Sequence, residues 1–262
     1  SASHAPRAKR DGNAAGNTLD VRIANALAWG EGQSCRISNG SYGTGESDLL
    51  TDTYNDTAAN GMLHFASAGN GGADNIGDNA LGSPARLANV QAVAAIDSDG
   101  GRSSFSNYGT GLDFSAPGTN VRSTDRAGSV GYTGNDYCTF SGTSAASPFA
   151  AGCAALIWSA YPDWTPAGIV NLMRFYATDL GVAGYDTGYG WGFPNVNDSI
   201  RSVFPQNNWC DMATTITTTA YNPATYSTAN ASEVPEELNE LCVPLATGVN
   251  HSVWYRYVVP CN

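Results

Sequence analysis

The chain has 262 residues and a net charge of −11, and only 13% of its residues are charged. An acidic surface repels nucleic acid and anionic lipid, so we expect neither as a partner. The charged share is about half of the typical one, and Gly, Ser, Thr and Asn are abundant, which favours a secreted, extracellular protein. The sequence has no apolar run long enough to span a bilayer and no signal peptide at its start, as expected of a mature or truncated product.

Helical and strand patterns alternate along the chain up to about residue 205. In chain order, they predict a helix over 19–30, a strand over 36–41, the end of a helix over 54–61, a buried strand over 62–68, strands over 90–96 and 112–115, a buried helix that includes 153–158, and a helix over 165–176 with Pro166 in its first turn. Such alternation predicts an α/β fold, a parallel sheet with helices on both faces.

After residue 205 the helical signals stop, and residues 214–219 and 252–259 are rich in residues that favour strands. The alternation of Val, Trp and Tyr in the second of these segments predicts the start of a small all-β sandwich, which we expect to be incomplete. We therefore predict two domains, over residues 1–204 and 205–262.

The six cysteines allow fifteen full pairings, and none of their spacings is a Cys-x-x-Cys zinc pattern. Cys210 and Cys242 bracket one segment near the C-terminus and form our preferred disulfide. Cys153 lies in the predicted buried helix, where a free thiol behaves as a small apolar side chain. Residues 74–79 gather Asp and Asn oxygens that make a candidate calcium site, although polar turns of this composition are usually just solvated. No cofactor is expected to be required.

Residues 140–148, Phe-Ser-Gly-Thr-Ser-Ala-Ala-Ser-Pro, carry the strongest signal for chemistry. They place Ser144 between a Gly-Thr turn and the start of a helix in which residues 149–158 have no polar side chain. At a helix N-terminus the dipole and the unpaired N–H groups stabilise developing negative charge, which acyl transfer requires. The alternative interpretation is that Ser144 is an ordinary N-cap of a buried helix.

This segment resembles the nucleophile motif of the subtilisin-like serine proteases, the subtilases. Five further segments resemble signatures of that family and follow in family order: residues 38–43, 63–71, 103–109, 114–118 and 189–196. The resemblance extends over about three quarters of the chain. It implies a subtilisin-like fold and the hydrolysis of peptide bonds by a serine endopeptidase.

The resemblance also implies roles for individual residues. Ser144 would be the nucleophile, and Asn70 would donate its side-chain amide to the oxyanion. Two segments would bind an extended peptide and form the walls of a specificity pocket: Ser41, Tyr42 and Gly43 on one side, Ser67, Ala68 and Gly69 on the other. These small, uncharged walls predict an apolar or broad preference. Outside such a family, Asn70 would be interpreted as a turn residue and the walls as ordinary strand packing.

A subtilase triad runs Asp, His, Ser along the chain, and its first two members are missing here. Of the three histidines, His64 lies in the strand that leads to Asn70, where we expect it to be packed or at an edge. His4 lacks the following Gly-Thr, and His251 lies far beyond Ser144. We therefore expect the chain to begin partway through a protease domain and to be inactive alone, a missing segment or second chain supplying Asp and His. The alternative is a non-catalytic structural or binding protein on a subtilase scaffold, within an extracellular assembly.

Overall fold

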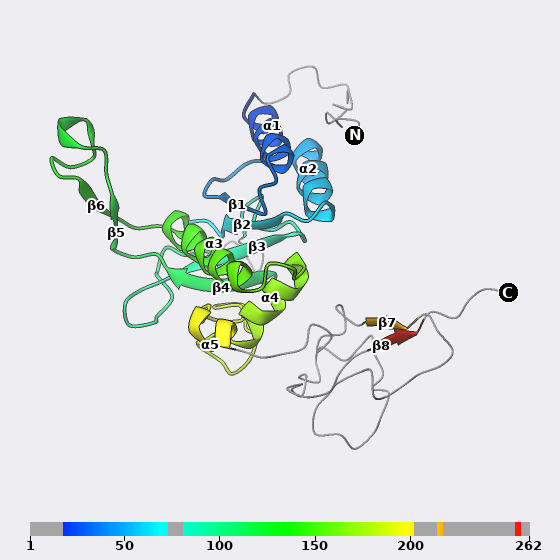
Figure 1. Ribbon diagram of the computed structural model, residues 1–262. Coiled ribbons are helices and arrows are strands. Elements are labelled where there is room, and N and C mark those ends of the chain that lie inside the picture. The colour runs from blue at the N-terminus through cyan, green and yellow to red at the C-terminus, as the bar shows by residue number, and fades with distance from the viewer. Residues whose placement is uncertain (1–17, 73–80, 202–213, 217–254, 258–262) are drawn as a thin grey trace.

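The computed structural model describes residues 18–72, 81–201, 214–216 and 255–257 (Figure 1). Its centre is a four-stranded sheet, and every neighbouring pair of strands in it is parallel. The strands, in spatial order, are β1 (Ile37–Gly40), β2 (Leu63–Ser67), β3 (Val90–Ile96) and β4 (Leu112–Pro117). The main helices are α1 (Thr18–Gly32), α2 (Asp48–Ala59), α3 (Thr143–Ala160) and α4 (Pro166–Phe175), followed by the short α5 (Val196–Arg201).

The helices cover both faces of the sheet, so the predicted α/β fold is confirmed (Figure 1). On the face covered by α3 and α4, a core cluster joins Phe65 and Phe114 of the sheet to Ile157 and Met173 of the helices. On the other face, α1 and α2 pack on a second cluster that includes Ala66 of β2. Side chains alternate between the faces of a strand, so neighbouring residues of β2 enter different clusters. All residues of β2 and β3 are buried, as expected of a parallel sheet covered on both faces.

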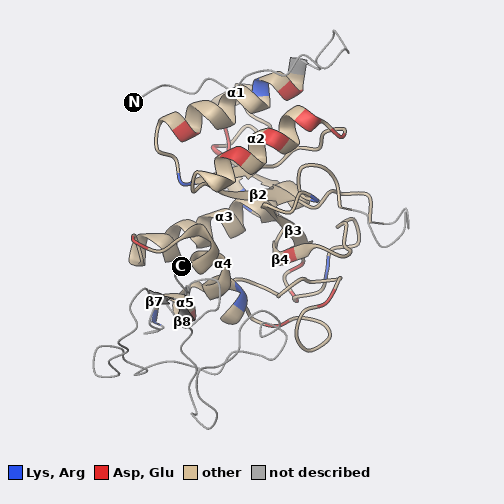
Figure 2. Cartoon of the chain, turned by 90° about the vertical axis from the view of Figure 1, so that its right-hand side faces the viewer, with Lys and Arg blue, Asp and Glu red and all other residues tan. Residues whose placement is uncertain are grey.

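Helix α2 begins earlier than the sequence predicted. It starts after Ser47, whose side chain accepts a hydrogen bond from the N–H of Leu50. Its exposed stripe carries Asp48, Asp52 and Asp56, and Figure 2 shows acidic positions along α2 in red. Its buried stripe contains Thr53 and Thr57, which weakens the apolar pattern, and only the end of the helix was predicted.

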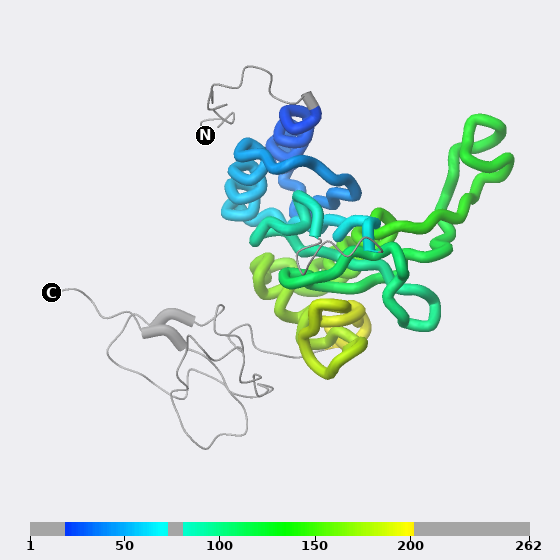
Figure 3. Tube along the Cα trace, turned by 180° about the vertical axis from the view of Figure 1, so that it is seen from behind, coloured from blue at the N-terminus to red at the C-terminus, as the bar shows by residue number. Residues whose placement is uncertain are grey.

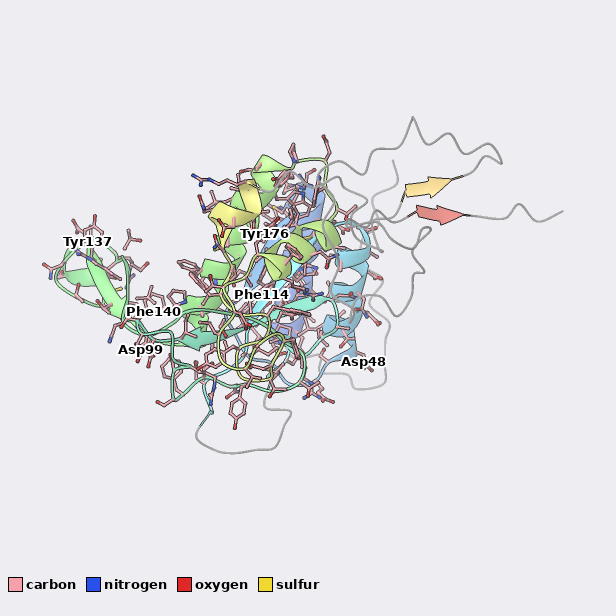
Figure 4. All side chains as sticks on the ribbon, turned by 90° about the horizontal axis from the view of Figure 1, so that it is seen from below. Asp48, Asp99, Phe114, Tyr137, Phe140 and Tyr176 are labelled. Carbon is pink, nitrogen blue, oxygen red and sulfur yellow. The ribbon has the colours of Figure 1, made fainter. Side chains whose placement is uncertain are left out.

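A two-stranded antiparallel ribbon projects from the body beside α3 (Figures 1 and 3). It consists of β5 (Val121–Thr124) and β6 (Tyr137–Phe140), with a single 3-10 turn, η1 (Gly128–Val130), between them. Figure 4 shows Tyr137 and Phe140 on this ribbon and Phe114 inside the packed body. The ribbon was not predicted from the sequence, and it leads directly into α3.

The C-terminal prediction is barely covered by the described residues. Two three-residue strands, β7 (Thr214–Ile216) and β8 (Tyr255–Tyr257), pair in parallel, and the β-sandwich and the boundary near residue 205 stay predictions. The candidate calcium ligands at 74–79, His4, His251 and the proposed Cys210–Cys242 disulfide lie outside the described residues. Within the described part, none of the helices is long and apolar enough to cross a membrane.

Candidate active site

Ser144 is the second residue of α3, and the N-cap of this helix is Gly142. The interpretation of Ser144 as an ordinary N-cap is therefore wrong. Gly142 has φ 152°, a positive value that favours glycine. The Ser144 side chain is half-buried, and no described residue forms a hydrogen bond with its hydroxyl or with its backbone N–H. Both groups are thus available to a ligand at the N-terminus of α3.

Asn70 lies beside this helix start, three residues after the end of β2. Its Oδ1 accepts two hydrogen bonds from Thr143, one from the backbone N–H and one from the hydroxyl, both 2.9 Å long. The Thr143 hydroxyl in turn accepts from the N–H of Gly69 at 3.2 Å. Because Oδ1 is held by the helix, the orientation of the Asn70 amide is fixed, and its NH2 group is left without a partner among the described residues.

The space between the Asn70 amide and the Ser144 N–H is kept open by Gly142. A Cβ atom at Gly142 would lie 3.5 Å from Asn70 Nδ2 and 3.6 Å from the Ser144 backbone nitrogen. Two unpaired donors therefore converge on one small volume at the positive end of a helix. Such an arrangement can accept an oxygen that gains negative charge.

The first turn of α3 is also tied to the end of β1. Pro148 follows Ser144 by four residues and has no N–H, so the Ser144 carbonyl lacks its usual intrahelical donor. The Ser41 hydroxyl takes this place and donates to the carbonyl at 2.9 Å. Asn39 Nδ2 donates to Ser41 Oγ at 3.0 Å, and Ser147 Oγ donates to Asn39 Oδ1 at 2.6 Å. Sequence reasoning missed Asn39 and Ser147, although the proline at position i+4 signals an unpaired carbonyl.

The two predicted walls are joined by one loop. After β1, the N–H of Thr44 donates to the Ser83 carbonyl at 2.9 Å, and after β2 the Ala68 carbonyl accepts from the N–H of Gly82 at 3.1 Å. Sequence reasoning missed both loop residues. Ser67 and Ala68 are buried, and at Gly69, with φ 108°, a side chain would overlap Asn107.

The Tyr42 side chain reaches α2. Its hydroxyl lies 2.8 Å from that of Tyr54 on α2, and burial raises the pKa of Tyr42. Gly43 is exposed. Of the first predicted wall, only Ser41 therefore touches α3 through its side chain.

His64 cannot serve Ser144, because its ring lies on the opposite face of the sheet. The ring contacts Thr57 and Tyr54 of α2 and is fully buried, so His64 is packed, one of the two expected placements. Burial lowers the pKa of His64 to about 4. Within residues 18–72 and 81–201, no carboxylate or histidine forms a hydrogen bond with Ser144, and no cluster of metal-ligating side chains occurs in the described part of the chain.

Known proteins with similar sequences and structures are proteases. The chain is 39% identical over 180 residues to alkaline elastase YaB of Bacillus sp. (strain YaB) and 38% identical over 180 residues to subtilisin BL of Lederbergia lenta. Each match covers 68% of this chain, but only 44% of the first relative and 61% of the second. A crystal structure of a lanthipeptide protease matches with a TM-score of 0.61 and 25% identity, covering 70% of this chain and 66% of that one. The subtilase family model matches residues 5–192, and the chain belongs to the subtilase family (peptidase S8).

Proposed function

We propose that this chain is the part of a secreted serine endopeptidase that carries the nucleophile and the oxyanion hole. The observation that supports this role is the convergence of Asn70 Nδ2 and the Ser144 N–H on the space left open by Gly142. The side chain of Asn70 is oriented for this role by the two hydrogen bonds that its Oδ1 accepts from Thr143. Calcium binding at residues 74–79 stays a candidate property outside the described residues.

In the proposed reaction, Ser144 Oγ attacks the carbonyl carbon of a peptide bond while a base removes its proton. The carbonyl oxygen becomes an oxyanion that accepts hydrogen bonds from Asn70 Nδ2 and the Ser144 N–H. Collapse of this intermediate breaks the C–N bond, and the leaving amine takes the proton from the base. Water then attacks the acyl-enzyme, with the same base accepting its proton, and releases the carboxylic acid and the free Ser144 hydroxyl.

The base must come from polypeptide outside the described residues, and β1 is where we propose that it docks. β1 is an edge strand of the sheet, and its outer edge has no partner strand in the described part of the chain. A segment that pairs with β1 would lie next to Ser144, because Ser41, directly after β1, donates a hydrogen bond to the Ser144 carbonyl.

The proposed substrate is an extended polypeptide that hydrogen-bonds to the backbone of residues 41–43, while residues 67–69 form the other wall of the pocket. Apart from Tyr42, these segments contribute small, uncharged residues, and Ser67, Ala68 and Gly69 directly precede Asn70 in the sequence. No charged side chain belongs to either segment, so we propose an apolar or broad preference for the residue before the cleaved bond. Proteins and peptides in the extracellular medium are the expected substrates.

A fluorophosphonate probe tests the proposed function, because it labels only an activated serine. We expect no labelling of the isolated 262-residue chain and stoichiometric labelling of Ser144 in the complete product of the same reading frame, abolished by Ser144→Ala. Labelling of the isolated chain would show that a group within it activates Ser144. If the complete protein also stays unlabelled, the non-catalytic structural or binding role is favoured instead.

A further inference from the structure

Strand β1 forms hydrogen bonds on both faces of the sheet. Because side chains alternate along a strand, Ser38 faces α2, whereas Asn39 and Ser41 face α3. Ser38 Oγ lies 2.7 Å from Nδ1 of His64. On the other face, Asn39 accepts from Ser147, and Ser41 donates to the Ser144 carbonyl. β1 therefore connects the buried His64 to the first turn of α3.

The hydrogen bonds define one neutral tautomer of His64. The Thr57 hydroxyl donates to the Thr53 carbonyl at 2.7 Å, so its oxygen accepts at 3.1 Å from His64 Nε2–H. Nδ1 is then unprotonated and accepts from the Ser38 hydroxyl. A single neutral imidazole thus joins α2, β2 and β1 in a directed chain of hydrogen bonds.

The surroundings of His64 offer nothing that would stabilise a positive charge. From α2, the Tyr54 ring meets the imidazole edge-on, with centroids 5.0 Å apart, and the Tyr54 hydroxyl is paired with Tyr42. β1 contributes Ser38, and β3 places Val90 opposite His64 in the sheet register. Neither described ion pair, Arg86–Glu46 or Arg174–Asp113, includes the ring. Burial alone lowers the pKa of His64.

We propose that His64 is a positioning residue. While neutral, it holds β1 through Ser38, so that Asn39 and Ser41 support the first turn of α3. Protonation of the ring releases β1. A proton on Nδ1 would reverse the Ser38 hydrogen bond and leave a charge among uncharged groups. β1 is the element that yields, because as the edge strand it is paired on one side only in the described residues. Release of β1 is expected of the 262-residue chain alone, because the segment that we propose to dock on β1 would pair its free edge.

Amide hydrogen exchange on the isolated chain tests this inference without any measurement of hydrolysis. Once β1 opens, His64 regains an ordinary pKa near 6.5, so opening takes up a proton below that pH. Between pH 7 and pH 5, after correction for intrinsic exchange rates, the protection of amides in β1 and at residues 145–147 should fall about 25-fold. The slowest amides of α4 report global unfolding, and we expect the β1 amides to exchange faster than these at both pH values.

Two variants and a control assign the effect. His64→Gln should abolish the pH dependence at β1 and at residues 145–147, whereas His251→Gln, the same substitution outside the described residues, should retain it. Ser41→Ala leaves His64 and Ser38 in place but removes the hydrogen bond to the Ser144 carbonyl, so β1 should keep the pH dependence while residues 145–147 follow it less. This variant carries the test if His64→Gln does not fold.

Three results would overturn the inference. The first is the same pH dependence in His64→Gln or, for residues 145–147, in Ser41→Ala. The others are no fall at residues 145–147 in the unsubstituted chain, and β1 amides as slow as the slowest amides of α4. The failure of fluorophosphonate labelling would contradict the proposed function alone, because the exchange measurement does not depend on it.

Discussion

The hydroxyl of Ser41 replaces a donor that α3 itself cannot supply. It lies 2.9 Å from the carbonyl oxygen of Ser144, the acceptor that the missing N–H of Pro148 leaves unpaired. Ser41, the residue after the edge strand β1, thereby satisfies the backbone carbonyl of the residue that we propose as nucleophile. Proline is tolerated at this position because the hydrogen bond it removes is replaced from another element.

Ser41→Ala should lower the free energy of unfolding by about 1–2 kcal/mol, because it leaves this partly buried carbonyl without a partner. Urea unfolding measures the change. Ser104→Ala is the matched control, since Ser104 is exposed and its hydroxyl has no described partner, and it should change the stability by less than about 0.5 kcal/mol. Equal effects of the two substitutions would contradict the role assigned to Ser41.

Asn70→Ala should reduce kcat of the complete protein by about 100- to 1000-fold with little change in KM, a range that was measured in a subtilisin, a relative of this chain. The substitution removes a donor that acts mainly in the transition state. Steady-state hydrolysis of a peptide substrate measures both constants. Asn89→Ala is the control. Asn89 is exposed and directly precedes β3, whereas Asn70 follows the end of β2, so this substitution should leave both constants unchanged. A rise in KM alone would indicate that Asn70 binds substrate instead.

The fold could be predicted because its central strands are mostly apolar segments bounded by turns. Residues 90–96 were predicted as a strand, and β3 occupies the same residues. The ribbon of β5 and β6 could not be predicted in this way, because its strands are four residues long and are largely exposed. Its existence depends on pairing across a Gly-rich loop, residues 125–136, which leaves no apolar periodicity in the sequence.

The candidate site was only partly predictable from the sequence. Ser144 and Asn70 were identified by resemblance, but the two hydrogen bonds from Thr143 that orient Asn70 join residues 73 positions apart. Likewise, only the fold reveals that His64 faces α2 whereas Ser144 lies on the α3 side. The residues that carry chemistry can be found from motifs, whereas their orientation depends on long-range contacts.

A partly buried ion pair at the start of β4 gives a third prediction. Arg174 Nη2 lies 2.9 Å from Asp113 Oδ1, and the other carboxylate oxygen accepts from the N–H of Ala92. Burial raises the pKa of Asp113 despite the opposing effect of Arg174. Arg174→Met should therefore lower the free energy of unfolding by about 3 kcal/mol, because it leaves a buried carboxylate without its cation.

Urea unfolding of a double variant distinguishes charge from packing at this ion pair. Adding Asp113→Asn to Arg174→Met should recover part of the lost stability, since no buried charge remains. Arg22→Met, at an exposed position of α1, is the control for the loss of a positive charge. A double variant less stable than Arg174→Met would show that the loss comes from packing.

The stability of the chain should fall as the pH is lowered from 7 to 5, and His64 should account for about 2 kcal/mol of that fall. Burial holds the pKa of His64 near 4 in the folded state, whereas an unfolded chain protonates this residue near pH 6.5. The unfolded state therefore binds more protons throughout this interval, so the contribution of His64 is complete above pH 6.5 and is lost as the pH falls towards 4. Urea unfolding at pH 7 and pH 5 measures the difference, which should be about 2 kcal/mol smaller in His64→Gln. An identical difference in the variant would mean that other groups, carboxylates above all, cause the acid sensitivity.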